Sequence, residues 1–309
     1  MGGGGGGSGG YFSGDPHSLD QLLRQAQTGT ASAQFETEIN AQLSEYLAEL
    51  NDRDTEEHSR LLDQIFEAID DAVEGHIDLK FGGSVAKHTY VDGLSDVDVL
   101  VRIERSELGD LSPEQAKQFI ADLLRANCLD CEVRVGTLAV TLKQGGTEVQ
   151  LLPALKIADT VHIADASGKQ WGKIRPEGFT KKLTELNTEN GEKLVPTVKL
   201  AKALLSTLPE KQRVTGYHAE SLAVEVFKGY DGPKTLKQML RTFFEGAAAR
   251  VLSPIRDRTG QSLHVDDYLG KEGSFERRVV ADAMGRLARK IANADSRQSI
   301  DEWKSLFEL

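Results

Sequence analysis

Two short motifs in the first third of the chain carry residue types that handle phosphate and divalent cations. In the first, Gly83 and Ser84 stand where a short strand pattern gives way to a short helix pattern. Glycine there lets the backbone approach a ligand closely, and the amides of the helix start, together with the Ser84 hydroxyl, can hold phosphate oxygens. In the second, Asp96 and Asp98 lie two residues apart. A strand places both carboxylates on one face, within reach of a shared pair of metal ions.

Each motif by itself has an ordinary structural explanation, because turns use glycine and serine and the solvent face of a strand often carries aspartate. Their combination is more informative. Val97, Val99 and Val101 form an aliphatic face opposite the aspartates, which predicts a half-buried strand with its carboxylates on an open surface. A phosphate-holding turn just before such a pair is typical of enzymes in which two Mg²⁺ ions stabilise the attacking and leaving oxygens of an in-line displacement.

The hydrophobic pattern predicts an α+β protein around these motifs. Apolar residues recur at three- and four-residue steps over 18–75, which predicts an N-terminal helical spine. Strands are predicted over 77–81, 96–102, 132–142 and 147–152 and a helix over 112–127, so a mixed β-sheet with flanking helices occupies about 77–155. Beyond 156 the pattern is mostly helical, with helices predicted over 191–208, 216–228, 235–251 and 274–295. We expect a cleft between the two halves.

Both motifs resemble a known signature. The stretches GGSVAKHT (82–89) and GLSDVD (93–98) are similar to the signature of the polymerase-β-type nucleotidyltransferase superfamily. Within it, they most resemble the bacterial cGAS/DncV-like nucleotidyltransferases (CD-NTases), the oligonucleotide synthases of CBASS-type anti-phage defence. The stretch EVQLLPA (148–154) resembles the third catalytic strand of that family. The resemblance implies a polymerase-β-like nucleotidyltransferase core with a C-terminal helical lobe.

The resemblance also implies a reaction. A nucleotidyl group would pass from a nucleoside triphosphate to a hydroxyl with release of pyrophosphate, supported by Mg²⁺ or, as an alternative metal, Mn²⁺. The motifs do not distinguish NTP from dNTP substrates, or a cyclic from a linear product.

The sequence departs from the family pattern at the third catalytic carboxylate. The family usually has an aspartate three residues before the proline of this strand, where this chain has Gln150. Glutamine is uncharged, binds Mg²⁺ poorly and cannot act as a base for the attacking hydroxyl. Glu148 lies two residues earlier on the same strand face, and its longer carboxylate can take this position. We predict that Asp96, Asp98 and Glu148 are catalytic and bind metal; the alternative is a degenerate site that binds nucleotide but reacts slowly.

Nucleotide binding is predicted for Gly83 and Ser84 and for three residues of the helical half. Lys199 and Lys202 share one helix face, and in the resemblance this helix borders the phosphates. The alternative for each is an ordinary solvated lysine, or one that complements a helix C-terminus. Tyr217, near the start of the next helix, can stack on a base; the alternative is a place in the hydrophobic core.

Charge and composition exclude several classes of protein. With 37 Lys+Arg against 48 Asp+Glu, the net charge of −11 is unsuited to coating duplex nucleic acid. No apolar run is long enough to span a bilayer, and the N-terminus lacks the basic and apolar regions of a signal peptide. Cys128 and Cys131 are the chain's two cysteines and are predicted to be two thiols at a helix–strand junction. Together these observations predict a cytoplasmic protein.

Three segments are predicted along the chain. Residues 1–17 form a glycine-rich tail, which is either mobile or anchored near the cleft by Tyr11 and Phe12. Residues 18–155 form the helical spine and the catalytic core, and residues 156–309 form the helical C-terminal lobe.

One basic cluster stands out in the C-terminal lobe. It consists of Arg250, Arg256 and Arg258. Either it holds product phosphates or it belongs to a surface loop tied by ion pairs.

The leading hypothesis for function is an enzyme that joins nucleoside triphosphates into a cyclic or linear oligonucleotide signal in bacterial anti-phage defence, which then acts on a separate effector protein. A second hypothesis keeps the chemistry but starts a linear RNA or DNA chain on a protein tyrosine hydroxyl such as that of Tyr11. A third, motivated by Gln150, is a nucleotide-binding sensor without catalysis.

Overall fold

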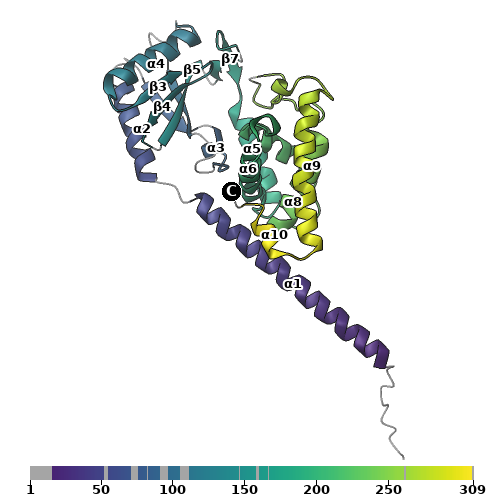
Figure 1. Ribbon diagram of the computed structural model, residues 1–309. Coiled ribbons are helices and arrows are strands. Elements are labelled where there is room, and N and C mark those ends of the chain that lie inside the picture. Colours follow the sequence, from purple (N-terminus) through teal and green to yellow (C-terminus); the bar gives the residue numbers. More distant parts are fainter. Residues whose placement is uncertain are drawn as a thin grey trace, which may run out of the picture.

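A mixed β-sheet and a lobe of helices lie side by side, and the short helix α3 (Gly83–Ala86) lies between them (Figure 1). The computed structural model describes residues 16–51, 55–70, 76–81, 83–90, 97–104, 111–145, 147–157, 160–165, 167–260 and 262–307. This arrangement confirms the predicted α+β class, with a sheet flanked by helices and a helical C-terminal lobe.

The sheet has seven strands in the described part of the chain. Its order is β1-β2-β5-β4-β3, with β6 beside the last residues of β5 and β7 beside β6. β2 and β5 run parallel, whereas the other described pairs are antiparallel. The strand bounds are β1 His76–Phe81, β2 Val97–Glu104, β3 Glu132–Val135, β4 Val140–Gln144, β5 Thr147–Ile157, β6 Thr160–Ala164 and β7 Trp171–Ile174.

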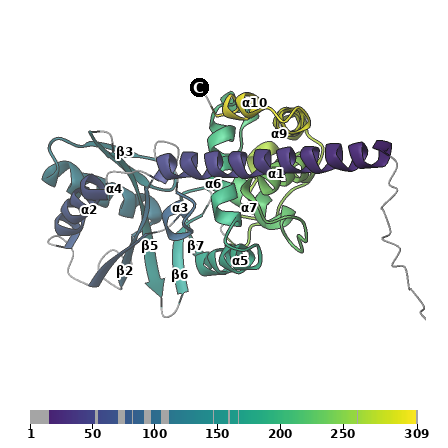
Figure 2. The ribbon, with the colours of Figure 1, turned by 90° about the horizontal axis from the view of Figure 1, so that it is seen from below.

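One face of the sheet is covered by α2 (Thr55–Asp70) and α4 (Pro113–Asn127), on the side away from the helical lobe (Figure 1 and Figure 2). Alternate strand residues such as Val99 and Val149 are buried in a hydrophobic cluster beneath these helices. Because side chains alternate along a strand, Asp98 is on the opposite face, where α3 packs against β2.

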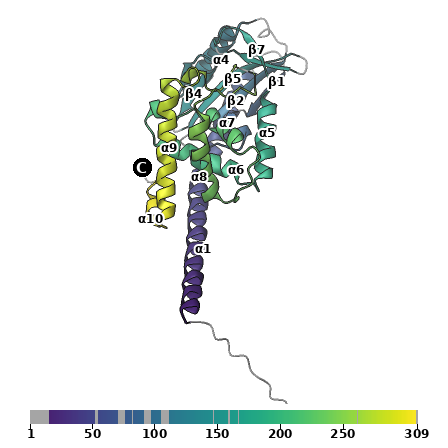
Figure 3. The same ribbon diagram turned by 90° about the vertical axis from the view of Figure 1, so that its right-hand side faces the viewer.

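The helical lobe has its own hydrophobic core, to which the second half of the long N-terminal helix contributes. Phe35, Ile39 and Leu43 of that helix recur at four-residue steps and are buried in this core. The first half of the helix projects beyond the body of the molecule, as Figure 3 shows. None of the described helices is long and apolar enough to cross a membrane. The helices of this lobe are α1 Pro16–Asn51, α5 Pro176–Glu189, α6 Leu194–Ser206, α7 Gly216–Val226, α8 Leu236–Arg250, α9 Phe275–Ser296 and α10 Ile300–Lys304.

A buried polar network fixes the loop between α8 and α9. Arg277 of α9 is fully buried, and its Nη1 donates to Asp266 Oδ2 at 2.6 Å. Its other N–H groups donate mainly to backbone carbonyl oxygens at the two ends of the loop. His218 of α7 places Nε2 3.6 Å from Asp266 Oδ2, and its Nδ1 lies 2.9 Å from the hydroxyl of Tyr268. Burial lowers the pKa of His218 to about 4, so the ring is neutral at pH 7.

The structure differs from the predicted elements in two places. The single strand predicted over 132–142 is two strands, β3 and β4, separated by a turn, and the chain adds α5, α10, β6 and β7, which the pattern did not indicate. In α5, Gly178 and Thr180 lower the intrinsic helix propensity. Burial of Phe179 and Leu183 against the lobe supplies the stabilisation that local propensity lacks.

The prediction of two thiols at positions 128 and 131 is wrong. Cys128 and Cys131 are joined by a disulfide whose Cα atoms are 5.4 Å apart. The physical reason is a tight turn between α4 and β3, in which the amide of Cys131 donates to the carbonyl oxygen of Cys128 at 3.2 Å and brings the two side chains together.

His88 provides a test of the backbone beside α3. It has left-handed backbone, with φ at 58°, and its side chain is exposed. Left-handed backbone costs an ordinary L-residue about 1–2 kcal/mol, and a β-branched residue tolerates it least. We expect His88→Gly to raise the free energy of unfolding by up to about 1 kcal/mol and His88→Val to lower it by about as much in urea denaturation.

Asp130 is the matched control for this test, because it is an exposed turn residue outside the left-handed region. There we expect glycine to lower the free energy of unfolding. A less stable His88→Gly protein would contradict the assigned backbone conformation.

The buried His218 predicts a pH dependence of stability. Its pKa is about 6.5 in an unfolded chain and about 4 in the folded protein. Between these values the unfolded chain binds more protons, so the free energy of unfolding falls as the pH drops from about 6.5 towards 4. We expect His218→Gln, which keeps a polar partner for Tyr268, to flatten this part of a stability curve measured by urea denaturation between pH 7.5 and pH 4.5. Identical slopes for the two proteins would show that His218 is not the titrating group.

Candidate active site

The predicted carboxylates of the sheet meet on one face of two neighbouring strands. In the parallel pairing of β2 with β5, Asp98 is in register with Gln150. Glu148 lies on the same face of β5 and is paired with Lys143 on β4. The structure therefore brings Asp98, Glu148 and Gln150 together on the face that also contacts α3.

Ser84 of α3, the helix that packs against β2, has a buried hydroxyl. Its side chain is 8% exposed, and its Oγ has no hydrogen-bond partner among the described residues. The turn around it is closed by the amide of Thr89, which donates to the Ser84 carbonyl oxygen at 2.9 Å. A buried hydroxyl without a partner is unfavourable, so a ligand oxygen that accepts from Ser84 Oγ would stabilise the site.

A buried ionic cluster connects the segment after α3 to the helical lobe. Glu220 of α7 is 1% exposed and is ion-paired through Oε2 with Lys87 and through Oε1 with Lys202 of α6, the latter at 2.7 Å. Glu220 Oε1 also accepts from the hydroxyl of Thr89. Lys202 Nζ donates in addition to the Thr89 carbonyl oxygen at 3.0 Å. These contacts join the segment after α3 to α6 and α7.

The charge states of this cluster follow from its surroundings. Burial favours the neutral form of Glu220, but Lys202 and Lys87 outweigh burial and hold its pKa below the usual value. Burial lowers the pKa of Lys202, while Glu220 and, more weakly, Asp98 raise it. The influence of Asp98 places the carboxylate of β2 within electrostatic range of the α6 lysine. Two lysines and one glutamate leave a local charge of +1, which favours a bound anion.

Tyr217 lies at the first turn of α7 with its ring beside Lys87. Lys87 Nζ is 5.0 Å from the centre of the Tyr217 ring and 5.3 Å from that of Phe179, and the two rings meet edge to face at 4.9 Å. The Tyr217 hydroxyl donates to Asp257 Oδ1 at 2.9 Å. Burial and Asp257 raise the pKa of Tyr217, so the group stays a neutral phenol. The ring is half buried and packs against the core of the helical lobe.

The other predicted residues lie in different settings. Lys199, one turn before Lys202 on α6, donates to Asn51 at the end of α1. Asp96 lies outside the described residues. Gly83 is described only as the first residue of α3.

Two of the three arginines in the basic cluster of the C-terminal lobe form ion pairs, and they share one glutamate. Arg250 and Arg258 both pair with Glu225, at 3.5 Å and 3.0 Å. These contacts agree with the ion-pair interpretation for two of its three members.

Lys87, Thr89 and Glu220 are the parts of the site that sequence analysis missed. Lys87 and Thr89 belong to the stretch that carries the family resemblance, so a signal was present for both. Glu220 lies 131 residues after Thr89 in the chain. A contact at such a separation has no local sequence signal.

Oxygen donors for a divalent cation are present on the sheet face. The carboxylates of Asp98 and Glu148 are hard ligands, and the amide oxygen of Gln150 is a neutral one. Within the ranges that the structure describes, no three carboxylate, imidazole or thiolate side chains form a ready-made metal site. The donors present fit Mg²⁺, which needs only one or two carboxylates besides water and substrate phosphates.

The arrangement of sheet, α3 and helical lobe is the fold of the CD-NTases. The predicted family resemblance is confirmed at the level of the fold. No family model and no curated protein matches the sequence.

Three solved structures illustrate the similarity. Escherichia coli MS115-1 CdnC with ATP is 16% identical, with a TM-score of 0.58 over 87% of this chain and 96% of that chain. The Vibrio cholerae DncV cyclic AMP-GMP synthase in complex with the linear intermediate 5′ pppA(3′,5′)pG is 10% identical, with a TM-score of 0.61 over 93% and 88%. Bradyrhizobium diazoefficiens CdnG in complex with GTP is 14% identical, with a TM-score of 0.59 over 82% and 88%.

The ionic cluster predicts a large effect of removing its central charge. Glu220→Gln leaves two buried lysines without their counter-ion, and breaking a buried ion pair in this way costs about 3–5 kcal/mol. We expect a loss of this size in the free energy of unfolding, measured in urea. The double variant Glu220→Gln/Lys202→Met should recover part of the loss.

The exposed pair Arg241 and Glu245, at 2.8 Å, is the control for this measurement. Replacing Glu245 by glutamine should cost less than about 1 kcal/mol. Equal effects at Glu220 and Glu245 would show that the buried cluster does not hold the lobes together.

Proposed function

We propose that the protein is a Mg²⁺-dependent nucleotidyltransferase that joins nucleoside triphosphates into a cyclic or linear oligonucleotide signal, with release of pyrophosphate. The observation that carries this proposal is the meeting of three features at the junction of the lobes. These are the buried Ser84 hydroxyl without a partner, the Asp98 carboxylate and the positively charged cluster of Lys87, Glu220 and Lys202. A triphosphate needs donors for its oxygens, carboxylates for its metal and positive charge nearby.

Each residue has a distinct role in this proposal. Ser84 and the amides at the start of α3 hold phosphate oxygens, and Lys202 and Lys87 supply positive potential behind them. Asp98 and Glu148, together with Asp96, would hold Mg²⁺, which when bound neutralises charge on the reacting phosphate. Glu148 accepts the proton of the attacking hydroxyl. The fold shared with structures in complex with ATP, with GTP and with a linear intermediate supports this assignment.

The wider role is part of the same proposal. A signal made in the cytoplasm for anti-phage defence would act on a separate effector protein. CdnC has also been solved in a complex with a HORMA protein, which supports the idea that this fold works with protein partners.

A second candidate function is favoured by one observation. Because Asp98 is in register with Gln150, a neutral amide faces it across the parallel pair. A nucleotide-binding sensor would keep the phosphate site and lack the third carboxylate at this position.

A nucleotide incorporation assay distinguishes the two candidates. Purified protein is incubated with each α-labelled NTP and dNTP and with Mg²⁺ or Mn²⁺, and the products are separated on a denaturing gel. We expect Asp98→Asn to lower incorporation at least about 100-fold and Glu148→Gln at least about tenfold, because a metal ligand and a base are lost. Asp122→Asn, on the exposed face of α4, is the control and should have no effect.

The outcomes separate the hypotheses. Label that stays on the protein after denaturation would indicate a tyrosine primer. Nucleotide binding without incorporation in the unmodified protein, together with gain of incorporation in Gln150→Asp, would establish the sensor. Undiminished incorporation in Asp98→Asn would refute the proposed site.

A further inference from the structure

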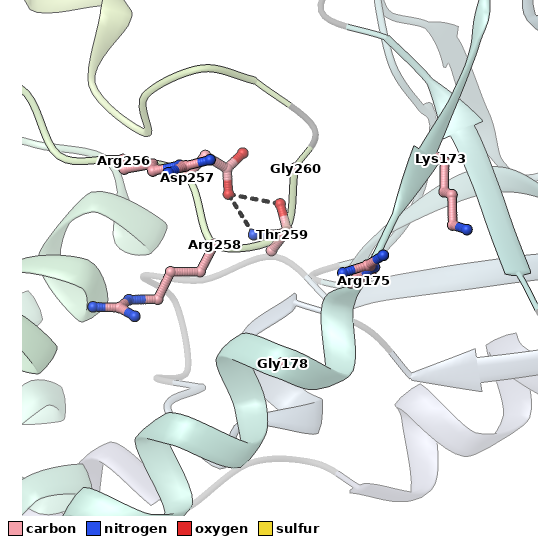
Figure 4. Close-up of a pocket in the computed structure, with 8 residues that line it drawn as sticks. All are labelled: Lys173, Arg175, Gly178, Arg256, Asp257, Arg258, Thr259 and Gly260. Carbon is pink, nitrogen blue, oxygen red and sulfur yellow. Dashed lines mark hydrogen bonds between the residues drawn. The ribbon is translucent and has the colours of Figure 1, made fainter.

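A second basic region adjoins the candidate active site. A hollow of about 650 Å³ lies between the end of β7, the first turn of α5 and the loop between α8 and α9 (Figure 4). Four of its lining side chains are cationic. Figure 4 shows Lys173 and Arg175 on the β7–α5 side and Arg256 and Arg258 on the loop side.

The loop wall of the hollow is held in place by Asp257. Its Oδ1 accepts from the Tyr217 hydroxyl and from the amide of Thr259 at 2.8 Å, and its Oδ2 accepts from the amide and hydroxyl of Ser262, both at 3.0 Å. Burial raises the pKa of Asp257, but these hydrogen bonds outweigh burial and lower it. The amide of Arg175 donates to the Thr259 carbonyl oxygen at 2.8 Å, which ties the two walls together. Both carboxylate oxygens of Asp257 are therefore occupied.

The four cations outnumber the negative charge of the hollow, which comes from the Asp257 carboxylate on the loop wall. Arg258 pairs with Glu225 at 3.0 Å. Lys173, Arg175 and Arg256 are exposed, and none of the three has an ion-pair partner in the part of the chain that the structure describes. In a protein with a net charge of −11, such a concentration of positive charge around one hollow indicates a site for an anion.

Phosphate is the anion that the chemistry favours. Two of the three cations without a described ion-pair partner, Arg175 and Arg256, are arginines, whose planar forks bind phosphate oxygens in pairs. The hollow has the volume of a small-molecule site, and the acidic chain as a whole does not suit a duplex nucleic acid. The Tyr217 hydroxyl donates a hydrogen bond to Asp257 on the wall of the hollow, whereas the Tyr217 ring lies beside Lys87. The hollow and the ionic cluster are thus neighbours at opposite ends of one side chain.

We propose that this hollow is a second anion site, which binds the phosphate groups of a small nucleotide through Lys173, Arg175 and Arg256. The choice of a nucleotide among phosphate compounds rests on the proposed function. The phosphate groups belong either to a free nucleoside triphosphate or to a 5′-triphosphorylated linear oligonucleotide. Both present the same phosphate chemistry to the site.

Isothermal titration calorimetry on the full chain tests the proposal, with inorganic tripolyphosphate, ATP and a 5′-triphosphorylated dinucleotide as probes. The test variant is Lys173→Ala/Arg175→Ala/Arg256→Ala. The control, Lys181→Ala/Arg278→Ala/Lys290→Ala, removes the same charge from exposed positions on α5 and α9. We expect the test variant to lose one binding site or to bind at least about 100-fold more weakly there, since charged hydrogen bonds are lost, while the control binds like the unmodified protein.

The probes also separate the two sources. Equal binding of tripolyphosphate and ATP would identify a free triphosphate as sufficient. Much tighter binding of the dinucleotide would identify a linear product. Test and control variants with the same stoichiometry and affinity would overturn the proposal.

A measurement on the unmodified protein removes any dependence on how the variants fold. Tripolyphosphate should protect Arg175 and Arg256, but not the exposed Arg278, from an arginine-selective dicarbonyl reagent, as read by peptide mass spectrometry. Equal modification with and without tripolyphosphate would overturn the site.

Failure of this site and failure of the proposed function are distinguishable. Protected arginines without nucleotide incorporation would refute only the proposed function. Incorporation with unprotected arginines would refute only the second anion site.

Discussion

The ion pairs of Glu220 with Lys87 and Lys202 hold the two halves of the molecule in a single arrangement. All three groups are largely buried, so each charge depends on the others for stabilisation that water would otherwise provide. Lys87 follows α3 directly, and α3 carries Ser84 and packs on the strand that carries Asp98. The ion pairs therefore connect the segment that carries Ser84 to helices α6 and α7 of the helical lobe.

The parts of the site that could be predicted are those encoded over short distances. The alternation of side chains along β2 determines which face of the sheet carries Asp98, and the short Gly-Ser motif marks the position of Ser84 at the start of α3. The parallel pairing that puts Gln150 opposite Asp98 joins residues that are 52 positions apart in the sequence. The pairing itself was not predicted; what was expected is that the carboxylates of the two strands act together on one face of the sheet. Pairings such as Thr89 with Glu220 depend on how complete helices pack, and packing leaves no periodic signal in the chain.

The missed elements have the same explanation. α5 contains residues of low helix propensity and exists because Phe179 and Leu183 are buried against the helical lobe. β6 and β7 form an antiparallel extension at the end of β5, where each strand is short and gains its stability from its neighbour. Local preference and tertiary packing agree in α2, α4 and β2, and these were the elements that the pattern indicated clearly.

The overall charge of the chain and the charge around its ligands are separate properties. A net charge of −11 describes the solvated outer faces, whereas both candidate ligand regions are locally positive. Tyr217 lies between these regions, with its ring against Lys87 and its hydroxyl on Asp257. A shift of α7 would move Tyr217 and would therefore change the surroundings of both candidate ligand regions.

The register of Asp98 with Gln150 also bears on how folding is linked to metal ions. Two carboxylates directly opposite each other on adjacent strands repel, and a cation is then needed to make the paired strands fully stable. A neutral amide at position 150 removes that repulsion from the centre of the sheet. The central strand pair can therefore form its full set of contacts before any metal arrives, and the folded state of this chain is less dependent on the supply of divalent cations than a chain with aspartate at the same position would be.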